Sequence, residues 1–127
     1  MKKPARKNES GLTLIEVLIA LAILGIALTA IIQSASQNIK NTIYLQNRTI
    51  AVWVGTYVIN SIRIGVIKLS GTPDILSKEN QTLGQNFVWE AALDATPNPR
   101  IKKIRVDVYH LPGHNKSAHL ESYVDIP

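Results

Sequence analysis

The chain has 127 residues, contains no cysteine and carries a formal net charge of +5. The lack of cysteine excludes a disulfide framework, a thiolate zinc site and a cysteine nucleophile. The first 11 residues hold four basic side chains and one acidic one, which leaves 10 basic against 8 acidic residues in the rest of the chain. Because a nucleic-acid-binding protein should keep a basic surface on its folded part, that class is not expected here.

An apolar run follows the basic start. It covers residues 12–32, and only four of its 21 residues are not strongly apolar: Thr13, Glu16, Gly25 and Thr29. As a helix, this run would be roughly 32 Å long, enough to cross the hydrocarbon core of a bilayer. The basic flank predicts that its N-terminal end faces the cytoplasm.

Three interpretations fit a basic start and an apolar run. A secretory signal peptide would use the small residues at Ser34 and Ser36 as its cleavage signal, although its apolar core should be shorter. A plain signal anchor fits the length and charge but gives no reason for Glu16, since a charge inside a bilayer is costly. The third interpretation takes "SGLTLIEVLIALAILGIA" as a single motif.

This stretch resembles the start of type IV pilins and of the pseudopilins of type II secretion systems. Their precursors have a short basic leader ending in glycine, then an apolar residue, Thr-Leu, another apolar residue and glutamate, followed by an apolar helix. The match is position by position over Gly11, Leu12, Thr13, Leu14, Ile15 and Glu16. Leu12 departs from the phenylalanine that is commonest at its position, which varies in the family.

The resemblance assigns roles to three of these residues. It implies that a membrane-embedded prepilin peptidase cuts between Gly11 and Leu12 and then methylates the new amine of Leu12. It also implies that the carboxylate of Glu16 pairs with the first-residue amine of a neighbouring subunit as the two dock in a filament. The alternative for Glu16 is an interfacial side chain that reaches the lipid headgroups.

Beyond the apolar run the sequence becomes amphipathic, and no proline occurs between Pro4 and Pro73. The pattern predicts one helix from about Thr13 to Arg63. We expect its apolar face to make the helix packing contacts through Ile43, Ile50, Trp53 and Tyr57. The expected domains are a cleaved leader over 1–11, a membrane-spanning and filament-core helix over 12–35, and a periplasmic domain over 36–127.

After the helix, residues 65–86 are rich in turn formers and predict an irregular connection. Three strands are expected next, over 86–93, 101–110 and 119–126. In the second of these, Ile104, Val106 and Val108 alternate with polar residues. Such one-faced alternation predicts a small antiparallel sheet packed on the amphipathic half of the helix, an α+β, pilin-like fold.

The second half of the helix carries a narrower resemblance, to the I-type minor pseudopilin of type II secretion systems. The matching residues are Tyr44, Leu45, Thr49, Ala51, Trp53 and Val54. Tyr57 departs from the asparagine that is frequent at its position. The resemblance is strongest over 11–63 and weak after residue 64. The Trp89 of the first expected strand and the small size of the chain fit the same subunit.

This resemblance implies a minor pseudopilin in the tip complex that starts the pseudopilus, the filament that drives export of folded proteins across the outer membrane. The implied partners are the J- and K-type minor pseudopilins, the major pseudopilin, prepilin peptidase, the inner-membrane assembly platform and membrane lipid, with no nucleic acid. The implied location is the Gram-negative inner membrane, single-pass, with the N-terminus cytoplasmic and the domain periplasmic before incorporation into the pseudopilus.

No pattern of catalytic or cofactor-binding residues is visible. The sequence has no phosphate-binding glycine loop, no G-x-S-x-G and no calcium-loop signature. His110, His114 and His119 are spaced so that a metal site is conceivable, but we expect solvent-exposed turn histidines instead. We therefore expect no enzyme activity, no cofactor and no metal.

One alternative of another class is a minor type IV pilin that serves adhesion or DNA uptake. It would use the basic side chains of the second expected strand: Lys102, Lys103 and Arg105. DNA binding through these residues should weaken steeply with salt.

Overall fold

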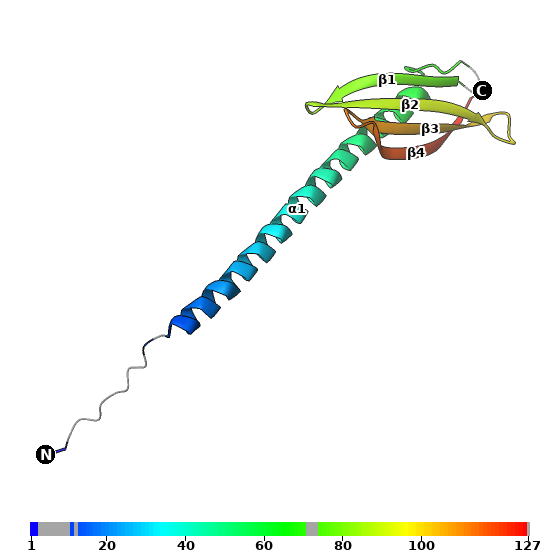
Figure 1. Cartoon of the computed structure of the whole chain (residues 1–127). Helices are drawn as coiled ribbons and strands as arrows, with labels where there is room; N and C mark the ends of the chain where they lie inside the picture. Colours follow the sequence, from blue (N-terminus) through cyan, green and yellow to red (C-terminus); the bar gives the residue numbers. More distant parts are fainter. Residues whose placement is uncertain (3–10, 12, 71–73, 127) are drawn as a thin grey trace. The chain divides into compact units, whose positions relative to one another are not determined.

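The computed structural model describes residues 1–2, 11, 13–70 and 74–126. Within these residues the chain forms one helix, α1 (Leu14–Arg63), and four strands, β1 (Asp74–Thr82), β2 (Gln85–Ala95), β3 (Ile101–His110) and β4 (Asn115–Asp125) (Figure 1). Contacts divide the chain into two units, Met1–Asn41 and Thr42–Pro127. The arrangement is the α+β, pilin-like fold that the sequence predicts, with one strand more than expected.

The part of α1 in the first unit is exposed along its whole length, and over residues 14–32 it is apolar on all sides except at Glu16, Gly25 and Thr29. An 18-residue window of α1 reaches a mean hydropathy of 2.7, so the helix is long and apolar enough to cross a membrane. Thr29 is one of its few polar residues, and its hydroxyl donates to the carbonyls of Gly25 (3.1 Å) and Ile26 (2.8 Å). The hydroxyl is therefore satisfied within the helix, as an apolar environment requires.

The C-terminal end of α1 is set by a Schellman motif. The Val66 amide donates to the Ser61 carbonyl at 2.9 Å, and the Gly65 amide donates to the Ile62 carbonyl at 3.1 Å. Gly65 has a φ of 77°, a left-handed conformation that costs glycine little. These bonds satisfy carbonyls that the last turn leaves without helical partners. The predicted helix end at Arg63 is confirmed.

The four strands form an antiparallel meander in which each strand pairs with its neighbours in the chain, in the order β1-β2-β3-β4. A two-residue turn joins β1 to β2, since Thr82 pairs with Gln85. Leu83 and Gly84 both have positive φ angles, 51° and 76°, as a type I′ hairpin turn requires.

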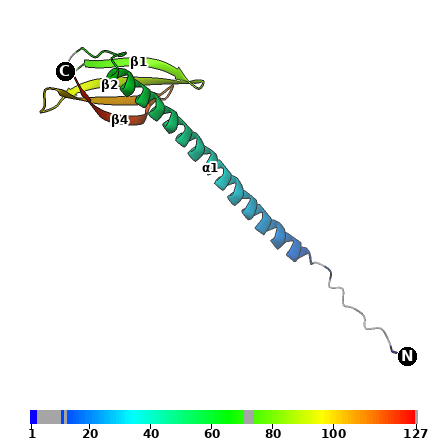
Figure 2. The same cartoon turned by 180° about the vertical axis from the view of Figure 1, so that it is seen from behind.

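The core of the second unit lies between the sheet and the last turns of α1. On the sheet side, the fully buried side chains include Phe87, Ile104, Val106 and Val108. Figure 2 shows the C-terminal end of α1 lying along one face of the sheet. The buried face of the helix comprises Ile50, Ala51, Val54, Gly55, Val58, Ile59 and Ser61.

The predicted packing face of α1 is largely wrong. Ile50 is buried, with 3% of its surface exposed, but Ile43, Trp53 and Tyr57 are 52%, 59% and 62% exposed. The reason is close approach: a Cβ on Gly55 would collide with Cδ1 of Leu120 on β4. The sheet packs against the side of the helix that carries Ala51 and Gly55. Trp53 and Tyr57 remain mostly exposed beside β1, where they line a groove with Asn80 and Thr82.

The predicted irregular connection over 65–86 is also wrong, because β1 and the β1–β2 turn occupy most of it. β1 is an edge strand with mostly polar side chains, and its Ile75 is 67% exposed. An edge strand of this kind lacks the alternation that reveals a half-buried strand. β2 and β4 begin before their predicted starts, whereas β3 matches its prediction in both bounds.

Replacing Ile104 by alanine should lower the free energy of unfolding by about 2–5 kcal/mol, because its fully buried side chain would leave a cavity. The matched control is Ile75→Ala on β1, which should change it by less than about 0.5 kcal/mol. Guanidinium unfolding of the purified chain in detergent, followed by Trp89 fluorescence, measures both. Equal losses in the two variants would contradict the assigned core.

Candidate functional site

Glu16 lies in the first turn of α1, and its own chain holds it there. The amide and the hydroxyl of Thr13 both donate to its Oε2, at 3.3 and 3.5 Å. In return, the Glu16 amide donates to the Thr13 hydroxyl at 3.4 Å, and it also donates to the Thr13 carbonyl at 3.1 Å. Thr13 also accepts the first intrahelical bond, from the Val17 amide at 3.2 Å. Thr13 and Glu16 thus form a reciprocal capping box at the start of the helix.

Gly11 is exposed and precedes this capping box by two residues. A Cβ built on it would meet no atom within 4 Å. Leu12, the other residue of the predicted cut and the predicted site of methylation, lies outside the described residues. Cleavage and methylation therefore stay predictions, and the structure describes only Gly11, Thr13 and Glu16 of the predicted site residues in this motif.

A second feature is the exposed side of α1 in the second unit, which extends to the edge of the sheet at β1. It exposes four large apolar side chains, Leu45, Val52, Trp53 and Tyr57. A groove of about 320 Å³ is lined by Leu45, Arg48, Thr49, Val52 and Trp53. The hydroxyl of Thr49 donates to the Leu45 carbonyl at 2.8 Å. This bond satisfies the hydroxyl locally, which makes the surface less polar than its sequence indicates. We call this surface the outer face of α1.

Neighbouring opposite charges cover the outward side of the sheet. Lys103 pairs with Glu121 at 2.7 Å, and Arg105 pairs with Asp94 at 3.2 Å. Two of the three basic residues on which DNA binding would depend are therefore already neutralised by carboxylates of their own sheet. The pairing disfavours the DNA-uptake alternative, since phosphate contacts need available positive charge.

Asp107 on β3 has two basic partners on this surface, as Glu121 does. Asp107 accepts hydrogen bonds from Lys116, at 3.1 Å, and from the Nδ1 of His119. Partial burial raises the pKa of Asp107, but the hydrogen bonds from His119 and Lys116 outweigh it, and the pKa lies below its ordinary value of 3.8.

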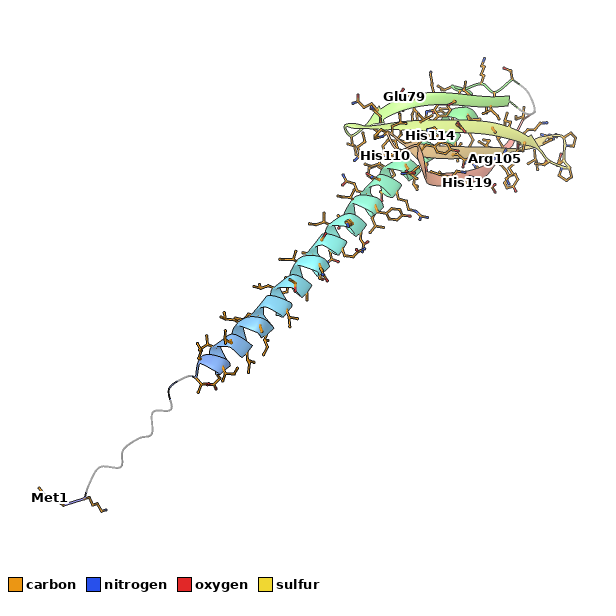
Figure 3. All side chains as sticks on the ribbon, viewed as in Figure 1. Met1, Glu79, Arg105, His110, His114 and His119 are labelled. Atoms are coloured by element: carbon orange, nitrogen blue, oxygen red, sulfur yellow. The ribbon has the colours of Figure 1, made fainter. Side chains whose placement is uncertain are left out.

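The three histidines lie in separate environments (Figure 3). His110 packs edge-on against Phe87, and His114 stacks on the ring of Tyr109 with centroids 4.7 Å apart. His119 lies on β4 and bonds Asp107. The expectation of turn histidines thus holds only for His114. Across residues 1–2, 11, 13–70 and 74–126, no group of three or more His, Cys, Asp or Glu side chains is placed to hold a metal ion.

Comparison with known proteins finds one family at the start of the chain and relatives along most of its length. The family described as the prokaryotic N-terminal methylation motif matches residues 6–32. The chain is also similar to proteins named type II secretion system protein I, in each case over 118 residues. The one from Pseudomonas aeruginosa is 26% identical, over 91% of this chain and 88% of the relative. Those from Aeromonas hydrophila and Vibrio cholerae are 29% and 28% identical, over 92% and 93% of this chain and 98% and 97% of the relatives.

A membrane-length helix that opens with a methylation motif and is followed in the chain by a four-stranded antiparallel sheet defines a pilin-like protein. Within that class, the chain is a homologue of type II secretion system protein I, which it matches over 91–93% of its own length in the three relatives described.

The two tryptophans should report the orientation of α1. Trp53 is 59% exposed and Trp89 is 4% exposed. In the purified chain, a Trp89→Phe variant should therefore show red-shifted emission that acrylamide quenches readily. A Trp53→Phe variant should show blue-shifted, protected emission. If Trp53 were instead the protected tryptophan and Trp89 the exposed one, the packing face predicted from the sequence would be right.

Asp107 should contribute to the pH dependence of stability. Its pKa is lower in the folded chain than in the unfolded chain, so its contribution is present above about pH 4 and is lost as the pH falls through the folded pKa. Asp107→Asn should flatten the decline of the melting temperature between pH 5 and pH 2. Asp125→Asn is the control, since that carboxylate forms only an exposed pair with Arg100. A decline as steep as that of the wild type in Asp107→Asn would refute the assignment.

Proposed function

We propose that the chain is a minor pseudopilin of a type II secretion system, a structural subunit and not an enzyme. The observation that carries the proposal is Glu16, a carboxylate held in the first turn of a membrane-length apolar helix and five residues after Gly11. The methylation motif over residues 6–32 and the names of the full-length relatives support the same assignment.

Glu16 is proposed to dock the subunit. A carboxylate at the centre of a membrane helix costs about 2.5–3.5 kcal/mol on insertion scales, and less toward the end where Glu16 lies. Pairing with the first-residue amine of a neighbouring subunit neutralises both charges at once. Docking is therefore most favourable for a subunit that brings an amine to the right depth, which gives the contact its selectivity.

The N-terminal steps prepare that amine. Prepilin peptidase removes residues 1–11 by cutting between Gly11 and Leu12, and methylates the amine of Leu12. Before assembly, residues 12–35 anchor the subunit in the inner membrane, with residues 36–127 in the periplasm. The basic residues ahead of the apolar run support this orientation, since basic flanks stay on the cytoplasmic side.

The proposed partners are the other pilin-like subunits of the same filament. We place the chain in the tip complex with the J- and K-type minor pseudopilins, above the major pseudopilin and the inner-membrane assembly platform. The outer face of α1 supports a role in assembly, because Trp53, Tyr57 and Leu45 are exposed apolar side chains on a folded domain. In this role the protein needs no cofactor and binds no nucleic acid.

The first test concerns docking. Glu16→Ala should be processed normally, but its recovery with the other pilin-like subunits of the same genome should fall at least about tenfold, because a charge-assisted bond worth about 1.5–3 kcal/mol is lost. The measurement is co-capture through a tag at the C-terminal end. Glu79→Ala on the exposed surface of β1 is the control. Unchanged co-capture of the Glu16 variant would sink the proposal.

The second test concerns the leader. Gly11→Ala should leave the precursor uncut, because a side chain then occupies the position that the peptidase reads. Mass spectrometry of the N-terminus in cells that contain prepilin peptidase should find chains starting at Met1. Gly25→Ala lies further along the same apolar run and should be cut like the wild type. A Gly11 variant that still begins at Leu12 would contradict the proposed cut.

A further inference from the structure

The capping box at the start of α1 uses only one of the two carboxylate oxygens of Glu16. The amide and the hydroxyl of Thr13 both donate to Oε2. No hydrogen bond or ion pair joins Oε1 to any residue in the described part of the chain. An ionised carboxylate accepts through both oxygens, so half of this group is held by its own helix while the other half is left open.

The box also limits the cost of keeping a charge in the apolar helix. The N-terminal turn of a helix has amides without helical partners and carries partial positive charge, so a carboxylate there is stabilised. Thr13 adds two donors to that favourable position, and its hydroxyl accepts from the Glu16 amide in return. A single subunit therefore carries Glu16 in a partly satisfied state rather than as an isolated charge.

The lengths of these contacts matter for docking. At 3.3–3.5 Å they lie beyond the usual 2.7–3.2 Å of a strong hydrogen bond. Contacts of this length orient the carboxylate through Oε2 without binding it tightly. Oε1 is then free to accept a strong, charge-assisted bond from an incoming amine while Oε2 keeps its place in the helix.

We propose that Thr13 is a positioning residue for subunit docking: by holding Oε2 of Glu16 in the capping box, it presents Oε1 to the amine of the neighbouring subunit. This inference rests on the proposed function, in which Glu16 receives that amine. It adds that the docking group has two parts, a threonine that orients the carboxylate and a glutamate that makes the contact.

The chain provides matched variants for the test. Thr13→Val keeps the shape of the side chain and removes the hydroxyl, whereas Thr13→Ser keeps the hydroxyl. Thr29→Val is the control, because Thr29 lies on the same helix and its hydroxyl bonds only the carbonyls of Gly25 and Ile26. The Glu16→Ala background shows whether Thr13 acts through Glu16 or by another route.

The first measurement is amide hydrogen exchange of the uncut full chain in detergent micelles. Glu16→Ala should expose the Thr13 amide to faster exchange by about fivefold, the usual effect of losing a helix cap. The Glu16 amide should change less in Thr13→Val, because it keeps its bond to the Thr13 carbonyl. Thr29→Val should leave both amides unchanged. Unchanged exchange of the Thr13 amide in Glu16→Ala would show that the box does not form and would overturn the inference.

The second measurement is co-capture of the tagged chain with the pilin-like proteins of the same genome, counted per chain that begins at Leu12. Thr13→Val should reduce recovery about fivefold, Thr13→Ser should restore it, and Thr29→Val should match the wild type. In the Glu16→Ala background, Thr13→Val should cause no further loss.

The outcomes separate the two proposals. If Glu16→Ala lowers recovery and Thr13→Val does not, or if Thr13→Val lowers it equally with and without Glu16, the positioning role of Thr13 is wrong and the docking role of Glu16 stands. If Glu16→Ala itself has no effect on recovery, the proposed function fails, and the role of Thr13 fails with it.

Discussion

The folded domain depends on one contact, between the small-residue side of α1 and the inner face of the sheet. Phe87, Ile104 and Val106 are fully buried there, and they have little else to pack against in a sheet whose outward side is covered with charges. A domain of this size has a small core, so losing any large part of the contact would unfold it. Gly55 is central to it, because a side chain at that position would collide with Leu120.

The same contact decides which side chains remain outside. Ala51 and Gly55 face the sheet, whereas Trp53 and Tyr57 remain mostly exposed beside its edge strand β1. A helix that is buried on one side and aromatic on the other is unusual in a protein that functions alone, because large exposed apolar surfaces mark sites of interaction. The apolar residues of the first unit are likewise exposed along α1. Within its described residues each unit therefore presents exposed apolar side chains, as a subunit does before assembly.

The sequence correctly predicts elements that have one apolar side and one polar side. It does not predict which side is buried where both sides have a similar composition. β3 was predicted in both bounds, because its polar side chains alternate with buried Ile104, Val106 and Val108. The sequence does not predict the orientation of α1, because both of its sides carry apolar residues and the large ones are not the buried ones. Close approach of a sheet instead requires small residues such as Gly55.

Two further misses have separate causes. β1 is polar and lies at an edge, and its turn places Leu83 in a left-handed conformation that is normally expected of Asn, Asp or Gly. The contact between Asp107 and His119 depends on the register of β3 with β4, which no local pattern determines. The capping box, by contrast, has a signal in the sequence, since Thr13 and Glu16 stand at the spacing that a box requires.

The order of the strands bears on how such a protein is made. Every strand pairs only with strands adjacent to it in the chain, so no strand waits for a distant partner to be synthesised. The helix that supplies one side of the core precedes the whole sheet. Strands can therefore be added to the helix one hairpin at a time, with short loops to close at each step. The topology is suited to folding in the order of synthesis.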